Sequence, residues 1–137
     1  MMKTMDCLFC KIAAGNISSE KIYETQDAMA FLDINPISKG HAVVIPKKHS
    51  QHLTQLNQDE LGLLFDAVKQ VSLMIEKGLN PDGFNIGVNQ GKTAGQAIPH
   101  LHVHVIPRYL GDGGGSLHSI ISNPPDESIE ETARRLR

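Results

Sequence analysis

The sequence predicts an α+β fold, in which an antiparallel sheet of about five strands packs with one long helix and a short N-terminal helix. Several short runs rich in β-branched residues are joined by short links, which favours antiparallel pairing over the long crossovers of parallel sheets. One long segment carries apolar residues at helical spacing. The chain has 137 residues and 40% hydrophobic content, enough for one domain with a sizeable core.

The elements before residue 50 are short. The stretch 7–12 can form a short helix that Gly15 would end, because glycine readily adopts the left-handed conformation of a helix C-terminus. The runs that follow predict a weak strand over 22–24, a stronger strand over 28–34 and a third strand over 40–46. Most of the expected sheet therefore precedes the long helix.

The segment from Asn57 to Gly78 predicts the long helix. Asn57 can cap its N-terminus, and Glu60 stands three residues later, which completes a capping-box pattern. The apolar stripe of this segment comprises Leu61, Leu64, Phe65, Val68, Val71 and Ile75. We interpret the stripe as core-facing and expect the helix to end at Gly78.

The chain after the helix predicts a hairpin and a C-terminal extension. The run 84–89 alternates as a strand, a glycine-containing loop follows over 90–98, and the run 99–107 would return as the next strand. The sequence after Tyr109 is rich in glycine, serine and asparagine. Residues 126–137 predict a short terminal helix with Glu130–Arg134 and Glu131–Arg135 pairs.

Three histidines spaced two residues apart give the main functional signal: His100, His102 and His104. Residues two apart on a strand share a face, so the imidazoles are expected on one side, roughly 6.6 Å apart along the strand. A helix is disfavoured because Pro99 and Pro107 bracket the run. The pattern alone leaves three interpretations: the polar face of a strand, a metal site, or a histidine-based reaction centre.

Composition restricts the classes of partner. The net charge of −2 gives no electrostatic signal for nucleic acid or an anionic membrane, and no apolar run approaches the ~20 residues that span a bilayer. The N-terminus has no apolar targeting segment, so a cytoplasmic location is expected. Cys7 and Cys10 form a C-x-x-C pair, which in that compartment suggests metal or redox chemistry before a structural disulfide.

The run 100–106 resembles the signature of the histidine triad (HIT) family, in which histidines alternate with apolar residues. Four further stretches are similar to that family in the same order: the C-x-x-C segment 6–12, the nucleoside-binding strand 31–36, the second strand 40–49 and the phosphate loop 89–96. The resemblance is to the Hint-like, zinc-containing C-x-x-C branch. It implies a HIT-like fold in a single HIT domain over 1–137, with a family-like core over about 6–108 and a C-terminal extension over 109–137.

The resemblance implies a nucleotidyl hydrolase or transferase that acts at the α-phosphate of a purine nucleotide conjugate and releases a nucleoside monophosphate. Nucleoside phosphoramidates, aminoacyl-adenylates and dinucleoside polyphosphates are all candidate substrates. His102 matches the family's nucleophile, which would form a covalent nucleotidyl-histidine, and a neutral imidazole suits that role near neutral pH. His104, His41 and Gln96 match the other catalytic positions.

The same resemblance implies a nucleotide-binding set. Phe31, Leu32, Asp33 and Ile34 would hold the nucleoside, and Asn89, Gly95, Gln96, Ala97, His102 and His104 would surround the transferred phosphate. A carboxylate such as that of Asp33 accepts hydrogen bonds well from ribose hydroxyls, and backbone amides of a glycine-containing loop can cradle an anion. Ala97 stands where the Hint-like branch often carries a small hydroxyl residue, so only its backbone contact is expected.

The cysteines need two further ligands to complete a tetrahedral zinc site. Resemblance to C-x-x-C members of the family, and to the related galactose-1-phosphate uridylyltransferases, points to His49 and His100 as those ligands. We therefore expect one structural zinc per chain held by Cys7, Cys10, His49 and His100, with no cofactor required for the chemistry. The resemblance also implies a homodimer with a continuous sheet.

Two other functions remain open from the sequence. A nucleotide-binding or adaptor protein with little catalysis would bind nucleotides without the turnover that His102→Ala should abolish. A metal-dependent enzyme with all three triad histidines as ligands would lose its chemistry to a chelator while staying folded.

Overall fold

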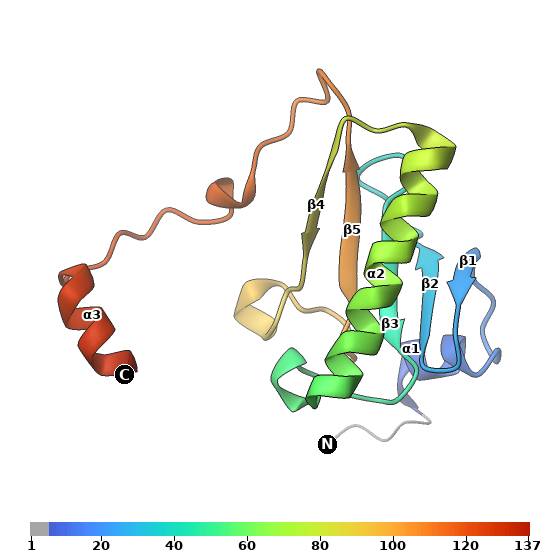
Figure 1. Ribbon diagram of the computed structural model, residues 1–137, viewed down its shortest axis with the longest axis horizontal. Helices are drawn as coiled ribbons and strands as arrows, with labels where there is room; N and C mark the ends of the chain where they lie inside the picture. The colour runs from blue at the N-terminus through green and yellow to red at the C-terminus, as the bar shows by residue number, and fades with distance from the viewer. Residues whose placement is uncertain (1–5) are drawn as a thin grey trace.

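The computed structural model describes residues 6–137, and its centre is a five-stranded antiparallel sheet in the order β1-β2-β3-β5-β4 (Figure 1). The expectation about the N-terminal targeting segment falls largely outside the described residues. In chain order the elements are α1 (Leu8–Ala13), β1 (Lys21–Glu24), β2 (Ala28–Leu32), β3 (Ala42–Pro46), η2 (Leu53–Gln55), α2 (Gln58–Leu79), β4 (Gly83–Gly87), η3 (Lys92–Ala94), β5 (Val103–Arg108), η4 (Leu117–Ser119) and α3 (Ile129–Leu136). The predicted α+β class is confirmed. Within the described range, no helix is both long and apolar enough to cross a bilayer.

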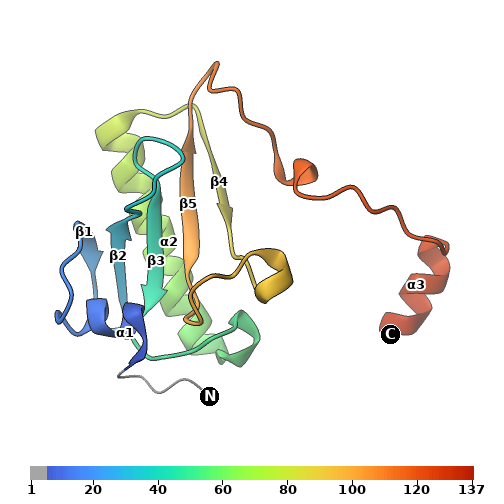
Figure 2. The ribbon, with the colours of Figure 1, turned by 180° about the vertical axis from the view of Figure 1, so that it is seen from behind.

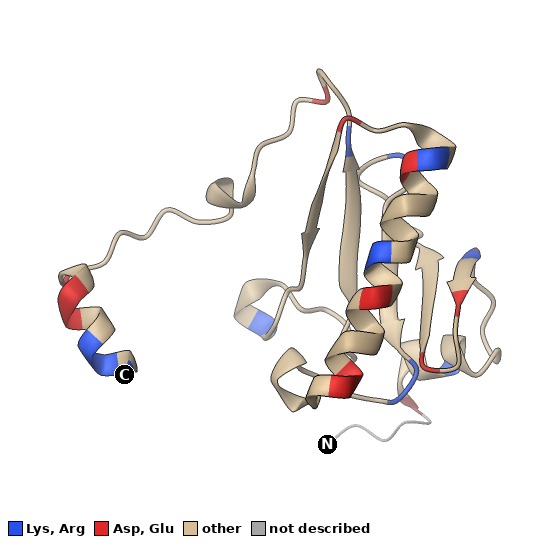
Figure 3. Cartoon of the chain, in the orientation of Figure 1, with Lys and Arg blue, Asp and Glu red and all other residues tan. Residues whose placement is uncertain are grey.

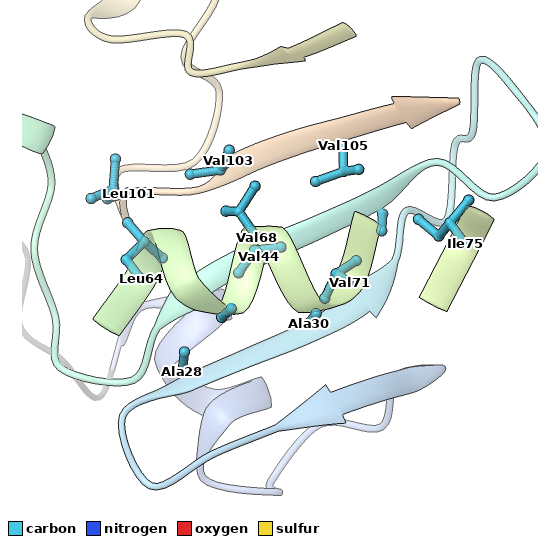
Figure 4. Close-up of a cluster of buried hydrophobic side chains, with 12 residues drawn as sticks. Ala28, Ala30, Val44, Leu64, Val68, Val71, Ile75, Leu101, Val103 and Val105 are labelled. Carbon is cyan, nitrogen blue, oxygen red and sulfur yellow. The ribbon is translucent and has the colours of Figure 1, made fainter. Parts of the chain in front are cut away.

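Helix α2 covers one face of the sheet and forms the main core with it (Figure 4). The strand residues of this core alternate with residues of the opposite face, as the two-residue period of a strand requires. The cluster comprises Ala28, Ala30, Ala42, Val44, Leu64, Ala67, Val68, Val71, Ile75, Leu101, Val103 and Val105. The predicted stripe is largely right, but Phe65 is 41% exposed and lies beside the buried line of α2 rather than in it.

A second, smaller cluster lies on the opposite face, where α1 packs (Figure 2). Its buried members are Cys7, Phe9, Ile12, Met29, Phe31, Val43 and Ile45. Val43 pairs with His104 across β3 and β5, so the side chain of His104 shares this face. The α2 face therefore supplies the bulk of the core, and the α1 face carries the histidines.

The ends of α2 show how local chemistry sets helix bounds. Asn57 Oδ1 accepts from the Glu60 amide at 2.8 Å, and the Glu60 carboxylate accepts from the Asn57 amide at 2.9 Å, which confirms the predicted capping box. The C-terminus differs from the expectation, because Gly78 is still helical and Asn80 adopts the left-handed conformation with φ 52°. Asparagine tolerates that conformation better than most residues, so it can end a helix as glycine does.

Two strands, β2 and β5, are shorter than the sequence predicts at one end, because the chain turns there. β2 ends at Leu32 instead of residue 34, because the Asp33 carboxylate accepts from the Asn35 amide at 2.8 Å and turns the chain. β5 begins at Val103 rather than Pro99, since Leu101 donates its amide to the Ser50 carbonyl at 2.6 Å instead of to the sheet. The expectation that one strand carries all three triad imidazoles is therefore wrong for His100 and His102, although the rings of both contact Phe9 of α1 and so lie on the same side of the sheet.

Residues 109–137 form an arm that leaves the sheet at the end of β5 and runs away from it (Figure 1). Arg108 fixes its start through an ion pair with Asp112 at 2.8 Å. The terminal helix begins at Ile129, after the Ser128 cap, and its charges run from acidic to basic along the axis (Figure 3). Arg135 pairs with Glu127 at 2.9 Å, in place of the predicted partner Glu131.

Candidate active site and candidate metal centre

The histidines of the run 100–104 divide between two clusters. The ring of His100 meets Cys7, Cys10 and His49, whereas the rings of His102 and His104 lie 5.0 Å apart, centroid to centroid, beside a cavity. This division follows from the chain, because His100 precedes β5 in a turn and His104 lies within the strand. A single metal ion held by all three triad histidines does not fit this arrangement.

The Cys7, Cys10, His49 and His100 cluster has the dimensions of a metal site. Cys7 Sγ and Cys10 Sγ lie 3.3 Å and 3.5 Å from His100 Nδ1, and the Nδ1 atoms of His49 and His100 are 3.3 Å apart. Tetrahedral zinc with usual bond lengths places its ligand atoms on the order of 3.3–3.8 Å from one another. The four residues predicted as zinc ligands therefore converge in a possible metal site.

The hydrogen bonding of His100 favours the ligand role. Its Nε2 lies 2.8 Å from the Pro46 carbonyl, which can only accept, so Nε2 carries the proton and the Nδ1 lone pair faces the thiols. Burial lowers the pKa of His100 to about 4, and the imidazole is accordingly neutral at physiological pH. Burial, followed by the neighbouring Cys7, raises the pKa of the Cys10 thiol to about 11, so metal binding must displace its proton. A closed Cys₂His₂ set suits zinc in a structural role.

The candidate active site is a cavity of about 720 Å³ on the α1 face of the sheet. That volume lies in the usual range for small-molecule sites, roughly 300–1,000 Å³. The predicted site residues that line it are Phe31, Leu32, Asp33, Ile34, His41, Asn89, Gly95, Ala97, His102 and His104. Almost the whole predicted nucleotide-binding set is therefore brought together, although its role in binding stays a prediction.

His102 is held in one tautomer. Its Nδ1 lies 2.7 Å from the His100 carbonyl oxygen, which can only accept a hydrogen bond. Nδ1 therefore carries the proton, and Nε2 keeps its lone pair. The ring itself lines the cavity. The ring is buried among other aromatic rings, with Phe9 at 5.1 Å and His104 at 5.0 Å between centroids.

His104 is held in the opposite tautomer through His41. The Ile37 amide donates to His41 Nδ1 at 3.3 Å, so the proton of His41 is on Nε2, which donates to His104 Nδ1 at 2.9 Å. His104 then carries its own proton on Nε2. Asp33 lies 3.6 Å from His41 Nε2 and favours that protonated nitrogen. Burial, with the nearby His102 and His41, lowers the pKa of His104 to about 4 and keeps it neutral.

The backbone conformation of Gly40 sets the turn that positions His41. Its φ is +89°, and a Cβ there would lie 2.5 Å from Leu79 Cδ1 and 3.3 Å from Pro107 Cγ. The backbone is thus both left-handed and pressed against the end of α2, a combination that only glycine accommodates without strain. The His41 carbonyl accepts from the Asp33 amide at 3.0 Å, which joins the two residues through their backbone as well.

The side chain of Gln96 is bonded to backbone groups, and its predicted catalytic role stays a prediction. Its Oε1 accepts from the Gly91 amide at 2.8 Å, and its Nε2 donates to the carbonyls of Gln51 at 3.0 Å and Ile98 at 3.1 Å. These bonds use the side-chain amide to close the loop between β4 and β5. Gly95 and Ala97 on either side of it do line the cavity.

Sequence reasoning missed some of the cavity wall. Asn85 lines the cavity, and the alternation of β4 could have placed it on the His104 face, because Gly87 pairs with His104. Leu117 and Ile120 of the arm also line it, and their segment offered no pattern from which to infer this. The Pro46 and His100 carbonyls set the tautomers of His100 and His102. These contacts cannot be predicted from the sequence, because every residue has a backbone carbonyl.

The chain belongs to the HIT family. The family model described as the HIT domain matches residues 14–111. An uncharacterized HIT-like protein of Methanocaldococcus jannaschii is 47% identical over 107 residues, which cover 78% of this chain and 82% of that protein. The predicted family is thereby confirmed.

Two further relatives carry more informative names. An adenosine 5'-monophosphoramidase of Schizosaccharomyces pombe is 41% identical over 104 residues, covering 76% of this chain and 75% of the relative. The crystal structure of a zinc-bound histidine triad family protein from Mycobacterium smegmatis matches with a TM-score of 0.76 and 35% identity, over 98% of this chain and 93% of that one. The fold is therefore shared along nearly the whole chain, arm included.

Proposed function

We propose that the protein is a nucleotidyl hydrolase or transferase that cleaves a nucleotide conjugate at its α-phosphate through a covalent intermediate on His102. The observation that carries this proposal is the pair of opposite tautomers beside the cavity. His102 presents a lone pair on Nε2, and His104 presents a proton on Nε2. One neutral imidazole can thus act as nucleophile while its neighbour donates a hydrogen bond, without any change of protonation beforehand.

The reaction proceeds in two displacements. His102 Nε2 donates its electron pair to the α-phosphorus, a P–N bond forms, and the bond to the leaving group breaks with its electron pair. The leaving group takes up a proton from solvent. Water then attacks the same phosphorus and gives up a proton to solvent, the P–N bond breaks with its electron pair returning to His102 Nε2, and the nucleoside monophosphate departs. In this proposal the His104 Nε2–H donates to a phosphoryl oxygen, where negative charge is concentrated as the bonds change.

The cavity wall fits a nucleotide in this reaction. Phe31, Leu32 and Ile34 supply an apolar side for a purine base, and Asp33 can accept from ribose hydroxyls. Asn89, Gly95 and Ala97 line the same cavity, and backbone amides of such a loop can hold a phosphate. The Schizosaccharomyces pombe relative, named for adenosine 5'-monophosphoramidate, supports an adenosine phosphoramidate as the first substrate to try.

Zinc at the Cys7, Cys10, His49 and His100 cluster forms part of this proposal, with a structural role. Support comes from the closed donor set, the neutral His100 ring and the zinc-bound relative.

We further propose one HIT domain that forms a homodimer. The outer edge of β4 has no strand partner among the described residues, and Ile86 on it and Phe65 and Leu73 on α2 expose apolar side chains.

The experiment that tests the function is intact-protein mass spectrometry after a rapid acid-free quench with adenosine phosphoramidate. We expect an added AMP mass on the wild-type chain, mapped to His102, and none on His102→Ala, with AMP release followed in the same samples. Diadenosine tetraphosphate in a parallel series ranks the substrate classes. Product formation that persists in His102→Ala contradicts the mechanism, and nucleotide binding without adduct or AMP indicates a binding protein instead.

A further inference from the structure

The cavity extends past His102 and His104 to the outer strand β4. The nucleoside wall of the proposed function lies on β2 and the turn that follows it, whereas Asn85, which also lines the cavity, lies on β4. Because the sheet order is β2-β3-β5-β4, Asn85 is on the opposite side of His104 from that wall. The register places it one pleat away, since Gly87 pairs with His104 and Asn85 with Ile106. Asn85 takes no part in the nucleoside and phosphate contacts proposed above.

The side-chain amide of Asn85 is held in one orientation by Arg108. Arg108 Nη1 lies 2.6 Å from Asn85 Oδ1, and a guanidinium can only donate, so the atom that it contacts is the amide oxygen. Asn85 Nδ2 makes no hydrogen bond to another described residue, and it is not among buried atoms that lack a partner. Nδ2 is therefore open to solvent on a residue of the cavity wall, and its N–H groups are available to an acceptor bound there.

Arg108 is itself fixed by the start of the arm. Its Nε and Nη2 each lie 2.8 Å from a carboxylate oxygen of Asp112, and its Nη1 also donates to the Gly115 carbonyl at 2.5 Å. A bidentate pair of this kind fixes the plane of the guanidinium and offsets much of its charge. The same side chain therefore holds both the Asn85 amide and the segment that leads to Leu117, a further residue of the cavity wall.

The rest of the wall on this side is apolar. Ile106 of β5 and Leu117 and Ile120 of the arm line the cavity, and the arm leaves the sheet on the β4 side (Figure 2). No lysine or arginine is among the described residues that line the cavity. A leaving group with several phosphates would bring negative charge to a wall that does not balance it. A neutral leaving group with an apolar body and one hydrogen-bond acceptor matches the wall better.

We propose that Asn85 is a specificity-determining residue, which donates from Nδ2 to an acceptor oxygen of the leaving group, and that this leaving group is otherwise apolar and uncharged. The inference rests on the proposed function and narrows its substrate classes. A phosphoramidate of an apolar amino acid ester fits, because its ester carbonyl lies close to the leaving nitrogen. In its cleavage the P–N bond of the substrate breaks, and the amine departs with the electron pair and takes up a proton from solvent. A dinucleoside polyphosphate does not fit, since its leaving group is polyanionic.

The test uses two adenosine phosphoramidates, one made with leucine methyl ester and one with 3-methylbutylamine, which keeps the apolar chain but lacks the ester. Asn85→Asp is the test variant, because a carboxylate still accepts from Arg108 but cannot donate. Asn123→Asp makes the same change at an exposed residue of the arm outside the cavity wall. The readout is the ratio of kcat/KM for the two substrates with zinc-loaded protein at neutral pH. An effect of the new charge on the phosphate that both substrates share cancels in this ratio.

We expect Asn85→Asp to lower kcat/KM about 5-fold more for the ester conjugate than for the 3-methylbutylamine conjugate, the scale of one neutral hydrogen bond. Asn123→Asp should keep the wild-type ratio. Calorimetry in a His102→Ala background, where the conjugates bind without turnover, should show the same selective loss of affinity on adding Asn85→Asp. In that background with Asn85 intact, the ester conjugate should also bind more tightly than diadenosine tetraphosphate.

An unchanged ratio in Asn85→Asp would overturn the proposed contact, and tighter binding of diadenosine tetraphosphate would overturn the proposed class of leaving group. An equal change of the ratio in Asn123→Asp would assign the effect to net charge and would also overturn the contact. If the wild-type protein forms neither adduct nor AMP from any conjugate, the proposed function fails. The calorimetric comparison then still decides whether Asn85 contacts the bound conjugate.

Discussion

The two histidine clusters of this protein share one short chain segment and differ in how their ring nitrogens are occupied. In the Cys7, Cys10, His49 and His100 cluster, the Nδ1 atoms face one another and the thiols across 3.3–3.5 Å. Around the cavity, the Nδ1 atoms of His102 and His104 are already engaged by the protein. Sulfur and nitrogen donors that converge on one point suit a cation, which displaces the thiol protons when it binds, whereas imidazoles with one nitrogen engaged suit reactions at the other.

The difference shows that the groups hydrogen-bonded to each imidazole, and not the imidazole itself, determine which ring nitrogen is free to bind or react. The Pro46 carbonyl directs the proton of His100 away from the cysteines, and the Ile37 amide determines, through His41, which nitrogen of His104 is protonated. Each of these partners is a backbone group from another part of the chain. The contrast between the clusters can be tested by removing one member of each and asking whether the other cluster responds.

The largest effect should come from Cys7→Ser. Free zinc at about 1,000-fold above its dissociation constant stabilises a folded protein by ~4 kcal/mol, and the variant should lose most of that gain. Urea unfolding with and without zinc, together with metal analysis, provides the measurement. His118→Ala, a histidine exposed on the arm, is the control that should keep the zinc. A wild-type protein whose unfolding is indifferent to zinc would remove the structural role from this cluster.

An intermediate effect should come from His104→Asn. Loss of the imidazole that donates to the phosphoryl group should lower the single-turnover rate by about 100-fold, the lower end of what a positioned proton donor contributes. Zinc content should stay as in the wild-type protein, because His104 belongs to the other cluster. A variant that loses both rate and zinc would show that the two clusters are not separable.

The smallest effect should be the pH dependence of stability that His104 contributes. Its pKa is lowered to about 4 in the folded protein, against an ordinary value of 6.5, so the unfolded chain binds more protons between those values. The contribution of the neutral ring is therefore fully present above the unfolded pKa and is lost as pH falls toward the folded one. Partial exposure limits the loss to no more than about 2 kcal/mol.

Urea unfolding of wild-type protein and His104→Asn from about pH 7 to about pH 4 measures this term. The stability of the wild-type protein should fall more steeply with decreasing pH than that of the variant. The metal ligands titrate in both proteins, so their effect cancels in the difference. Parallel curves would contradict the assignment of the buried, neutral imidazole.

The sequence predicted the elements whose causes are local and missed what depends on distant backbone. The Asn57–Glu60 capping box and the strand alternation act within a few residues, and both are present in the structure. The early end of β2 and the late start of β5 depend on hydrogen bonds from Asp33 and to Ser50, which no periodicity reports. Phe65 lies at the margin of the helical stripe, where spacing alone does not separate buried from exposed positions.

The candidate site shows the same limit. Family resemblance predicted His49 as a zinc ligand with the cysteines and His41 as a residue of the catalytic site. The structure pairs His49 with Cys10 and His41 with His104, which are 39 and 63 residues apart in the chain. Neither pairing could be worked out from spacing. The hydrogen bonds that the Gln96 side chain makes with the backbone of Gly91, Gln51 and Ile98 could not be predicted from spacing either.

The turn at Gly40 has a consequence for mutational scanning. Any side chain at this position would meet the tip of the Leu79 side chain at the C-terminal end of α2 and would strain the left-handed backbone that precedes His41. Gly40 has no chemistry of its own and does not line the cavity wall. A scan scored on growth or activity should nevertheless find Gly40 as intolerant of substitution as the histidines. Its contribution is steric, because it has no side chain at a place where a side chain does not fit.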